Sequence, residues 1–151
     1  MKNYRLFGFI FILSLMLSCV TPNPVYQMKS PCANVSSEEL FNALTAVLVQ
    51  ENFVIKTIEI KIGYLYAEKA PEYNSYYSGT IIESWTIQHS ENKITAIAKR
   101  RAIVQSQYGP VASDGYYNDN TPKNITGYWN IRNAIEKICG DKLIIEVKNI
   151  N

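Results

Sequence analysis

The first nineteen residues constrain this chain most, because they determine where the remainder must fold. Lys2 and Arg5 supply a short positive segment, and an apolar run over residues 6–17 follows it. This arrangement predicts a secretory signal peptide over residues 1–18. The apolar run is about twelve residues long, whereas a helix that spans a bilayer takes about twenty, so a permanent transmembrane anchor is the weaker interpretation. The rest of the chain is therefore expected to fold outside the cytoplasm.

The end of the predicted signal peptide contains a candidate lipidation site. Met16-Leu17-Ser18-Cys19 resembles the lipobox of bacterial lipoproteins, with Met16 where that motif prefers Leu. The resemblance implies that Cys19 becomes the first residue of the mature chain and is acylated, which would hold the protein firmly at a membrane. The alternative is an ordinary cleaved signal that ends near a cysteine. Among such lipoproteins Asp after the cysteine retains the protein at the inner membrane, so Val20 favours the outer membrane, with the domain facing the periplasm.

Charge and cysteine content narrow the class of protein. Of 15 basic residues, Lys2 and Arg5 leave with the signal, and the remainder equal the 13 acidic residues in number. A neutral chain has no field that would hold nucleic acid, so that class is excluded. In an oxidising compartment Cys32 and Cys139 favour one disulfide over a metal site. Two isolated buried thiols are the alternative.

The segment before Cys32 is rich in proline. Residues 19–31 contain Pro22, Pro24 and Pro31, a composition that disfavours helix and predicts a lipidated tether outside the core. At about 3 Å per extended residue, this tether could lift the domain some 35 Å from the lipid. Residues 32–151 are then expected to form a single domain.

Two helices are predicted from capping and periodicity. Ser36 followed by Glu39 is a capping-box pattern, and apolar residues at i, i+4, i+7 and i+8 predict a helix that ends near residues 50–52. Another helix is predicted over about residues 125–139, with Gly140 placed to stop it. The apolar positions are Leu40, Leu44, Val47 and Leu48 in the first helix and Tyr128, Ile131, Ile135 and Ile138 in the second.

Four strands and a short fifth are predicted from their β-branched residues. Residues 53–58 and 64–69 form a hairpin interrupted at Gly63, although one long strand is the alternative. Residues 80–88 and 94–105 are joined by a polar turn, and residues 143–148 form a short final strand. Residues 70–79 and 108–124 are read as loops.

The predicted fold is α+β: an antiparallel sheet of about four to five strands packed by two helices, in the order α-β-β-β-β-α-β, as a two-layer sandwich.

A helix that runs into Asn52-Phe53-Val54-Ile55, followed by the strand Gly63-Tyr64-Leu65-Tyr66-Ala67, resembles the helix-grip domains of BamC-type outer-membrane lipoproteins. The resemblance implies a sheet that grips a helix and an accessory role in inserting β-barrels. This chain departs from the pattern because it has room for one domain and only a short tether.

Short connections place the two loops at one end of the sheet, and the tether with Cys32 and Cys139 at the other. Tyrosine is enriched in recognition surfaces, so the loops are predicted to form a docking surface that faces away from the membrane. The alternative is that these aromatic side chains pin the loops to the rim of the sheet. The tyrosines of this candidate surface are Tyr73, Tyr76, Tyr77, Tyr108, Tyr116 and Tyr117.

No residue pattern predicts catalysis, a metal or a cofactor. His89, the only histidine, is expected to be a solvated turn residue. Glu38-Glu39 suits a helix start. Lys99-Arg100-Arg101 is interpreted as a surface ladder with cross-strand acids, and Asp114 and Asp119 as turn residues.

These observations predict a non-enzymatic envelope lipoprotein. Its partners would be the membrane, through the lipid anchor, and another envelope protein, which it could serve in envelope assembly. The alternative is a glycan- or peptidoglycan-binding or structural envelope lipoprotein. The sequence makes no prediction about oligomeric state.

Overall fold

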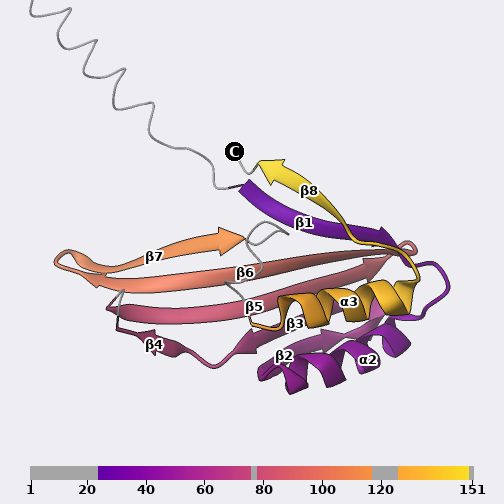
Figure 1. The fold of residues 1–151 in the computed structure, drawn as a ribbon, viewed down its shortest axis with the longest axis horizontal. Helices are drawn as coiled ribbons and strands as arrows, with labels where there is room; N and C mark the ends of the chain where they lie inside the picture. The colour runs from indigo at the N-terminus through magenta and orange to yellow at the C-terminus, as the bar shows by residue number, and fades with distance from the viewer. Residues whose placement is uncertain (1–23, 76–77, 117–125, 150–151) are drawn as a thin grey trace, which may run out of the picture.

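A computed structural model describes residues 24–75, 78–116 and 126–149, which form one antiparallel sheet and two α-helices (Figure 1). The helices are α2 (Ser37–Gln50) and α3 (Tyr128–Cys139), and a short 3₁₀ turn, η1, spans Ile60–Ile62. The strands are β1 (Pro24–Pro31), β2 (Phe53–Glu59), β3 (Tyr64–Lys69), β4 (Glu72–Asn74), β5 (Gly79–Ser90), β6 (Lys93–Ser106), β7 (Gly109–Tyr116) and β8 (Ile144–Asn149).

The strands follow the order β2-β3-β5-β6-β1-β8, with β4 added to β5 and β7 added to β6. Two strands share one edge of β6: β1 pairs with residues 93–96, and β7 pairs with residues 99–106. In Figure 1, β1 and β8 rise away from the sheet as a pair while β7 stays beside β6. The sheet therefore opens between β1 and β7.

The core lies between the helices and one face of the sheet (Figure 1). Alternate residues of β3, β5 and β6 turn toward the helices, as the two-residue period of a strand requires. Trp85 and Tyr128 pack with ring centroids 5.8 Å apart, and both are buried. Burial raises the pKa of the Tyr128 hydroxyl to about 12. The other large buried side chains include Met28, Leu40, Phe41, Leu44, Leu48, Leu65, Ile87, Ile94, Ile131 and Ile135.

Both predicted helices are present, and all of their ends except the start of α3 lie where the sequence predicts them. The Ser36 hydroxyl accepts a hydrogen bond from the Glu39 amide (3.1 Å), so α2 begins where the capping box predicts. Gly140 ends α3 in the left-handed region, as predicted. The start of α3 differs, because Gly127 has φ +65° and the helix begins at Tyr128, later than residue 125.

The α+β class, the antiparallel sheet and the two helices are confirmed, but the prediction of four to five strands is wrong. Among the described residues there are eight strands, and the first precedes α2. Parts of both predicted loops are strands: β4 pairs with the start of β5, and β7 pairs with β6 over eight residues. The turn-forming side chains did not prevent pairing, because the backbone N–H and C=O groups of these segments find hydrogen-bond partners on an open strand edge.

The tether prediction is wrong for residues 24–31, which form β1 between β6 and β8. Pro24 and Pro31 stand at the two ends of the strand, where a missing N–H is tolerated. Met28 and Ser30 are buried, so this segment belongs to the domain. Residues 19–23 lie outside the described part.

The direction of β1 also overturns the predicted placement of the tether. Pro31 lies opposite Lys93 at the β5–β6 turn, and Cys32 follows directly, whereas Pro24 lies at the other end of the strand. The chain therefore enters the domain at the end of β1 remote from the disulfide. The tether and the two cysteines do not share one end of the sheet.

Candidate functional site

The described parts of the two predicted tyrosine loops belong to one projecting part of the sheet. We call it the tyrosine wing: β4, β7, residues 79–83 of β5 and residues 100–106 of β6. It extends beyond both helices in Figure 1. Tyr73 is 69% exposed and Tyr108, in the β6–β7 turn, is 91% exposed. These two side chains therefore lie in solvent and are not packed against the rim of the sheet.

The remaining tyrosines of the predicted surface are only partly located. The backbone of Tyr116 ends β7 opposite Lys99, and its side chain is not described. Tyr76, Tyr77 and Tyr117 lie outside the described residues. The wing nevertheless brings Tyr73 and Tyr108 to the same end of the β5–β6 pair, as the topology argument predicted.

Electrostatic contacts hold β7 on β6. Asp114 Oδ2 lies 2.6 Å from Lys99 Nζ, and Asp114 Oδ1 lies 2.8 Å from Arg101 Nε. Hydrogen bonding from Arg101 is the main reason that the pKa of the Asp114 carboxyl is lowered, and Lys99 adds to this effect. The predicted cross-strand ladder is thus confirmed for Lys99 and Arg101. The interpretation of Asp114 as a turn residue is wrong, since it pairs within β7, and Asp119 lies outside the described part.

The prediction for His89 is also wrong. His89 belongs to β5 and is only 8% exposed. Its Nε2 lies 3.0 Å from the Cys32 carbonyl oxygen, and its Nδ1 lies 2.9 Å from Ser37 Oγ. A carbonyl only accepts, so in the neutral ring Nε2 carries the proton and Nδ1 accepts from the Ser37 hydroxyl. Sequence reasoning missed the pair because the two residues meet only when α2 packs beside the end of β5.

A serine bonded to a histidine is the beginning of a nucleophilic site, but here the contacts favour a structural role. The ring joins three elements: the end of β1 at Cys32, the start of α2 at Ser37, and β5. The backbone of His89 is engaged as well, since its N–H donates to the Gly63 carbonyl at 2.8 Å. We interpret His89 as a structural residue whose hydrogen bonds hold these segments together.

Cys32 and Cys139 lie at disulfide-bonding distance, as the sequence analysis expects. Their sulfur atoms are 2.04 Å apart and their Cα atoms 4.6 Å apart. Cys32 follows β1 and is fully buried, and Cys139 is the last residue of α3. The pair joins segments that are 107 residues apart in the chain.

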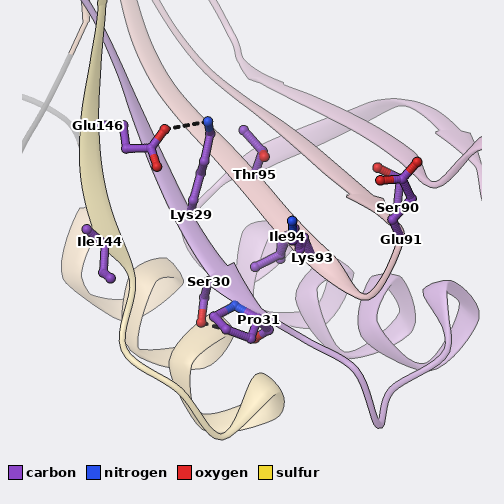
Figure 2. A pocket seen from close by; sticks show the side chains of 10 residues that line it. All are labelled: Lys29, Ser30, Pro31, Ser90, Glu91, Lys93, Ile94, Thr95, Ile144 and Glu146. Carbon is purple, nitrogen blue, oxygen red and sulfur yellow. Dashed lines mark hydrogen bonds and ion pairs between the residues drawn. The ribbon is translucent and has the colours of Figure 1, made fainter.

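A groove lies near this end of the molecule, on the face of the sheet opposite the helices. We call it the disulfide-end groove, and Figure 2 shows its lining. Its volume is about 390 Å³. The Lys29 ammonium pairs with Glu146 across β1 and β8 (2.5 Å), while Thr95 lies between them and the β5–β6 turn. The lining residues are Lys29, Ser30, Pro31, Ser90, Glu91, Lys93, Ile94, Thr95, Ile144 and Glu146.

The groove is mixed in chemistry. Two lysines balance two glutamates, and Ile144 supplies an apolar wall that is 66% exposed. Sequence reasoning missed it because its residues come from β1, β6, β8 and the β5–β6 turn, and residues 24–31 were assigned to a tether. Such a lining can hold a polar ligand with both donors and acceptors.

Within the part of the chain that the structure describes, no three His, Cys, Asp or Glu residues are grouped to hold a metal ion. None of the described helices has the length and apolar character needed to cross a bilayer. Comparison with known proteins adds no relative: no family model, no curated protein and no solved structure matches this chain. The lipobox and helix-grip resemblances therefore stay predictions that depend on the residues quoted for them.

Proposed function

We propose that this protein is an envelope lipoprotein, anchored through Cys19, that binds another protein of the same membrane through the tyrosine wing. The observation that carries the proposal is the exposure of Tyr73 (69%) and Tyr108 (91%) at the end of an extended sheet. A tyrosine offers a large apolar face and a hydroxyl at small entropic cost, which suits a protein interface. An accessory role in envelope assembly is one form that such binding could take.

The entry of the chain into the domain favours a partner in the same membrane. Only four residues separate Cys19 from Pro24, and this short connection spans at most about 17 Å. Pro24 lies at the end of β1 that is remote from the disulfide, which is the direction in which the wing extends. The expectation that the tyrosines face away from the membrane depended on a tether at the disulfide end. We propose instead that the tyrosine wing lies on the side of the domain where the chain enters from the membrane.

Site-specific photo-crosslinking in cells tests this function. A photoreactive residue in place of Tyr73 or Tyr108 should give a discrete adduct with a membrane protein. Trp129 is the matched control, because it is an exposed aromatic residue (46%) on α3, away from the wing. In a variant that combines Tyr73→Ser with Tyr108→Ser, a photoreactive residue at a third position should no longer crosslink to the membrane protein. The melting temperature of this variant should be unchanged. Adducts of equal yield at Trp129 would contradict the proposal.

A second candidate function is binding of a glycan, such as peptidoglycan, in the disulfide-end groove. The polar, charge-balanced lining of this groove favours it. Retention of the protein on purified peptidoglycan, lost when Thr95→Trp fills the floor of the groove, would support this candidate over the wing.

A further inference from the structure

The two ends of the main sheet path differ in how well they resist pairing with another strand. An edge strand presents unpaired N–H and C=O groups, and proteins protect such edges with bulges, charges or proline. β2 is protected, because its pairing shifts between Ile55 and Thr57 at a bulge that contains the exposed Lys56. The two added strands offer poor edges as well, since β4 has three residues and β7 contains Pro110.

β8 has no bulge, and its two charged residues, Glu146 and Lys148, are of opposite sign. It pairs with β1 over six consecutive residues without a shift in register, and it contains no proline. Ile144 and Val147, which point to opposite faces of the strand, are both exposed, at 66% and 57%. Figure 1 shows β8 at the border of the sheet, beyond β1. A regular and open strand edge is a template for a further strand.

We propose that β8 pairs with β8 of a second copy of this chain, in antiparallel orientation, with Val147 opposite its own counterpart on a two-fold axis. In this register Glu146 of each copy lies opposite Lys148 of the other, so two pairs of opposite charges flank the axis. A register centred on Glu146 would place two carboxylates face to face, which is unfavourable. The self-complementary order Glu146-Val147-Lys148 therefore selects both the occupant and the register.

The position of the chain start is compatible with this dimer on a membrane. Pro24 lies opposite Asn149, so the strand that enters from the lipidated segment is the one next to the interface. Strand spacings of about 4.8 Å and a rise of about 3.4 Å per residue place the two Pro24 residues about 20 Å apart. The two-fold axis is perpendicular to the paired strands, so the two Pro24 residues lie at the same height along this axis. Both lipid anchors can therefore insert into one leaflet.

Pairing of one six-residue strand buries less than the roughly 1,000 Å² that a stable interface needs, so the dimer should be weak in dilute solution. Two anchors in one leaflet raise the effective concentration and should favour it. The strength of the dimer thus depends on the proposed anchoring, whereas its register does not.

Cysteine crosslinking of the full-length protein in its native membrane tests the register. Opposed residues of antiparallel strands have Cα atoms about 4.5–5.5 Å apart, within the range of a disulfide. Val147→Cys should therefore form a covalent dimer under mild oxidation. Ile144→Cys is the matched control, because it is as exposed on the same strand but its two copies would lie about 20 Å apart.

We expect at least a tenfold higher yield of dimer from Val147→Cys than from Ile144→Cys on a non-reducing gel. Addition of Lys148→Glu to Val147→Cys should reduce the yield, because Glu146 would then face a carboxylate. Equal yields, a higher yield from Ile144→Cys, an adduct with a different protein, or no dimer would overturn the proposal. Membrane pelleting of the same samples reports anchoring separately, and oxidation of the purified protein at high concentration tests the register if anchoring fails.

Discussion

At the scale of single residues, Asp114 shows how one carboxylate fastens a strand. It bonds to Lys99 and Arg101 on β6, and these contacts lower its pKa in the folded state. A group whose folded pKa is lower than its unfolded pKa, about 3.9 for Asp, stabilises the fold above that pH. This stabilisation is lost as the pH falls through the folded pKa.

Asp114→Asn should therefore lower the free energy of unfolding at pH 7 by about 1 kcal/mol or less, the range of partly exposed ion pairs. The difference from the unaltered protein should shrink as the pH falls below about 4, where Asp114 becomes protonated in the unfolded state, and disappear once the pH is below the folded pKa. Urea denaturation at a series of pH values from 7 downward measures this dependence. Asp141→Asn, at an exposed carboxylate after α3, is the control. A difference that does not shrink as the pH falls would show that the amide disturbs packing.

At the scale of elements, Gly63 determines how β2 joins β3. Its φ is +63°, and its N–H donates to the Ile60 carbonyl at 3.1 Å to close η1. A Cβ at this position would lie 1.8 Å from the His89 carbonyl oxygen of β5. Only glycine allows both this backbone conformation and this close approach.

Gly63→Ala should destabilise the protein by about 3 kcal/mol, because the left-handed conformation and the clash with backbone both cost free energy. Gly140→Ala is the matched control: its φ is +79°, but an added Cβ would meet nothing within 4 Å. That variant should lose only about 1 kcal/mol for the conformation. Chemical denaturation of the two variants separates the contributions, and equal losses would contradict the role assigned to the contact with β5.

At the scale of the whole molecule, the Cys32–Cys139 pair closes nearly all of the domain into one loop. Crosslinking segments 107 residues apart should stabilise the domain by about 3–5 kcal/mol on the chain-entropy model. Cys32→Ser combined with Cys139→Ser should lose that amount, a large share of the 5–15 kcal/mol typical of a domain. Denaturation with and without reductant measures it. Intact mass of the protein isolated from cells, with and without reductant, checks the bond, and two free thiols would contradict it.

Much of the fold was predictable because the interactions that specify it are local. The cap at Ser36, the apolar stripe of α2 and the stop at Gly140 involve residues a few positions apart, so their pattern is visible in the chain. The β5–β6 hairpin is equally local, and its paired residues meet across the short turn at Glu91 and Asn92. The pairing of Cys32 with Cys139 was predictable from the expected compartment and from the order of the elements.

The remaining features depended on contacts between distant parts of the chain. Met28 pairs with Ala96 on one side and with Ile145 on the other, so a proline-rich segment became a central strand for reasons that its own composition does not contain. β7 pairs with β6 over eight residues, and the contacts of Asp114 with Lys99 and Arg101 add to this pairing.

The sequence by itself determined the helices, the main hairpins and the cysteine pair, because short-range periodicity and capping specify them. Only the tertiary structure decided the direction of entry, the burial of His89, the groove and the open edge at β8. Each of these depends on which strand edges remain free once the core has packed.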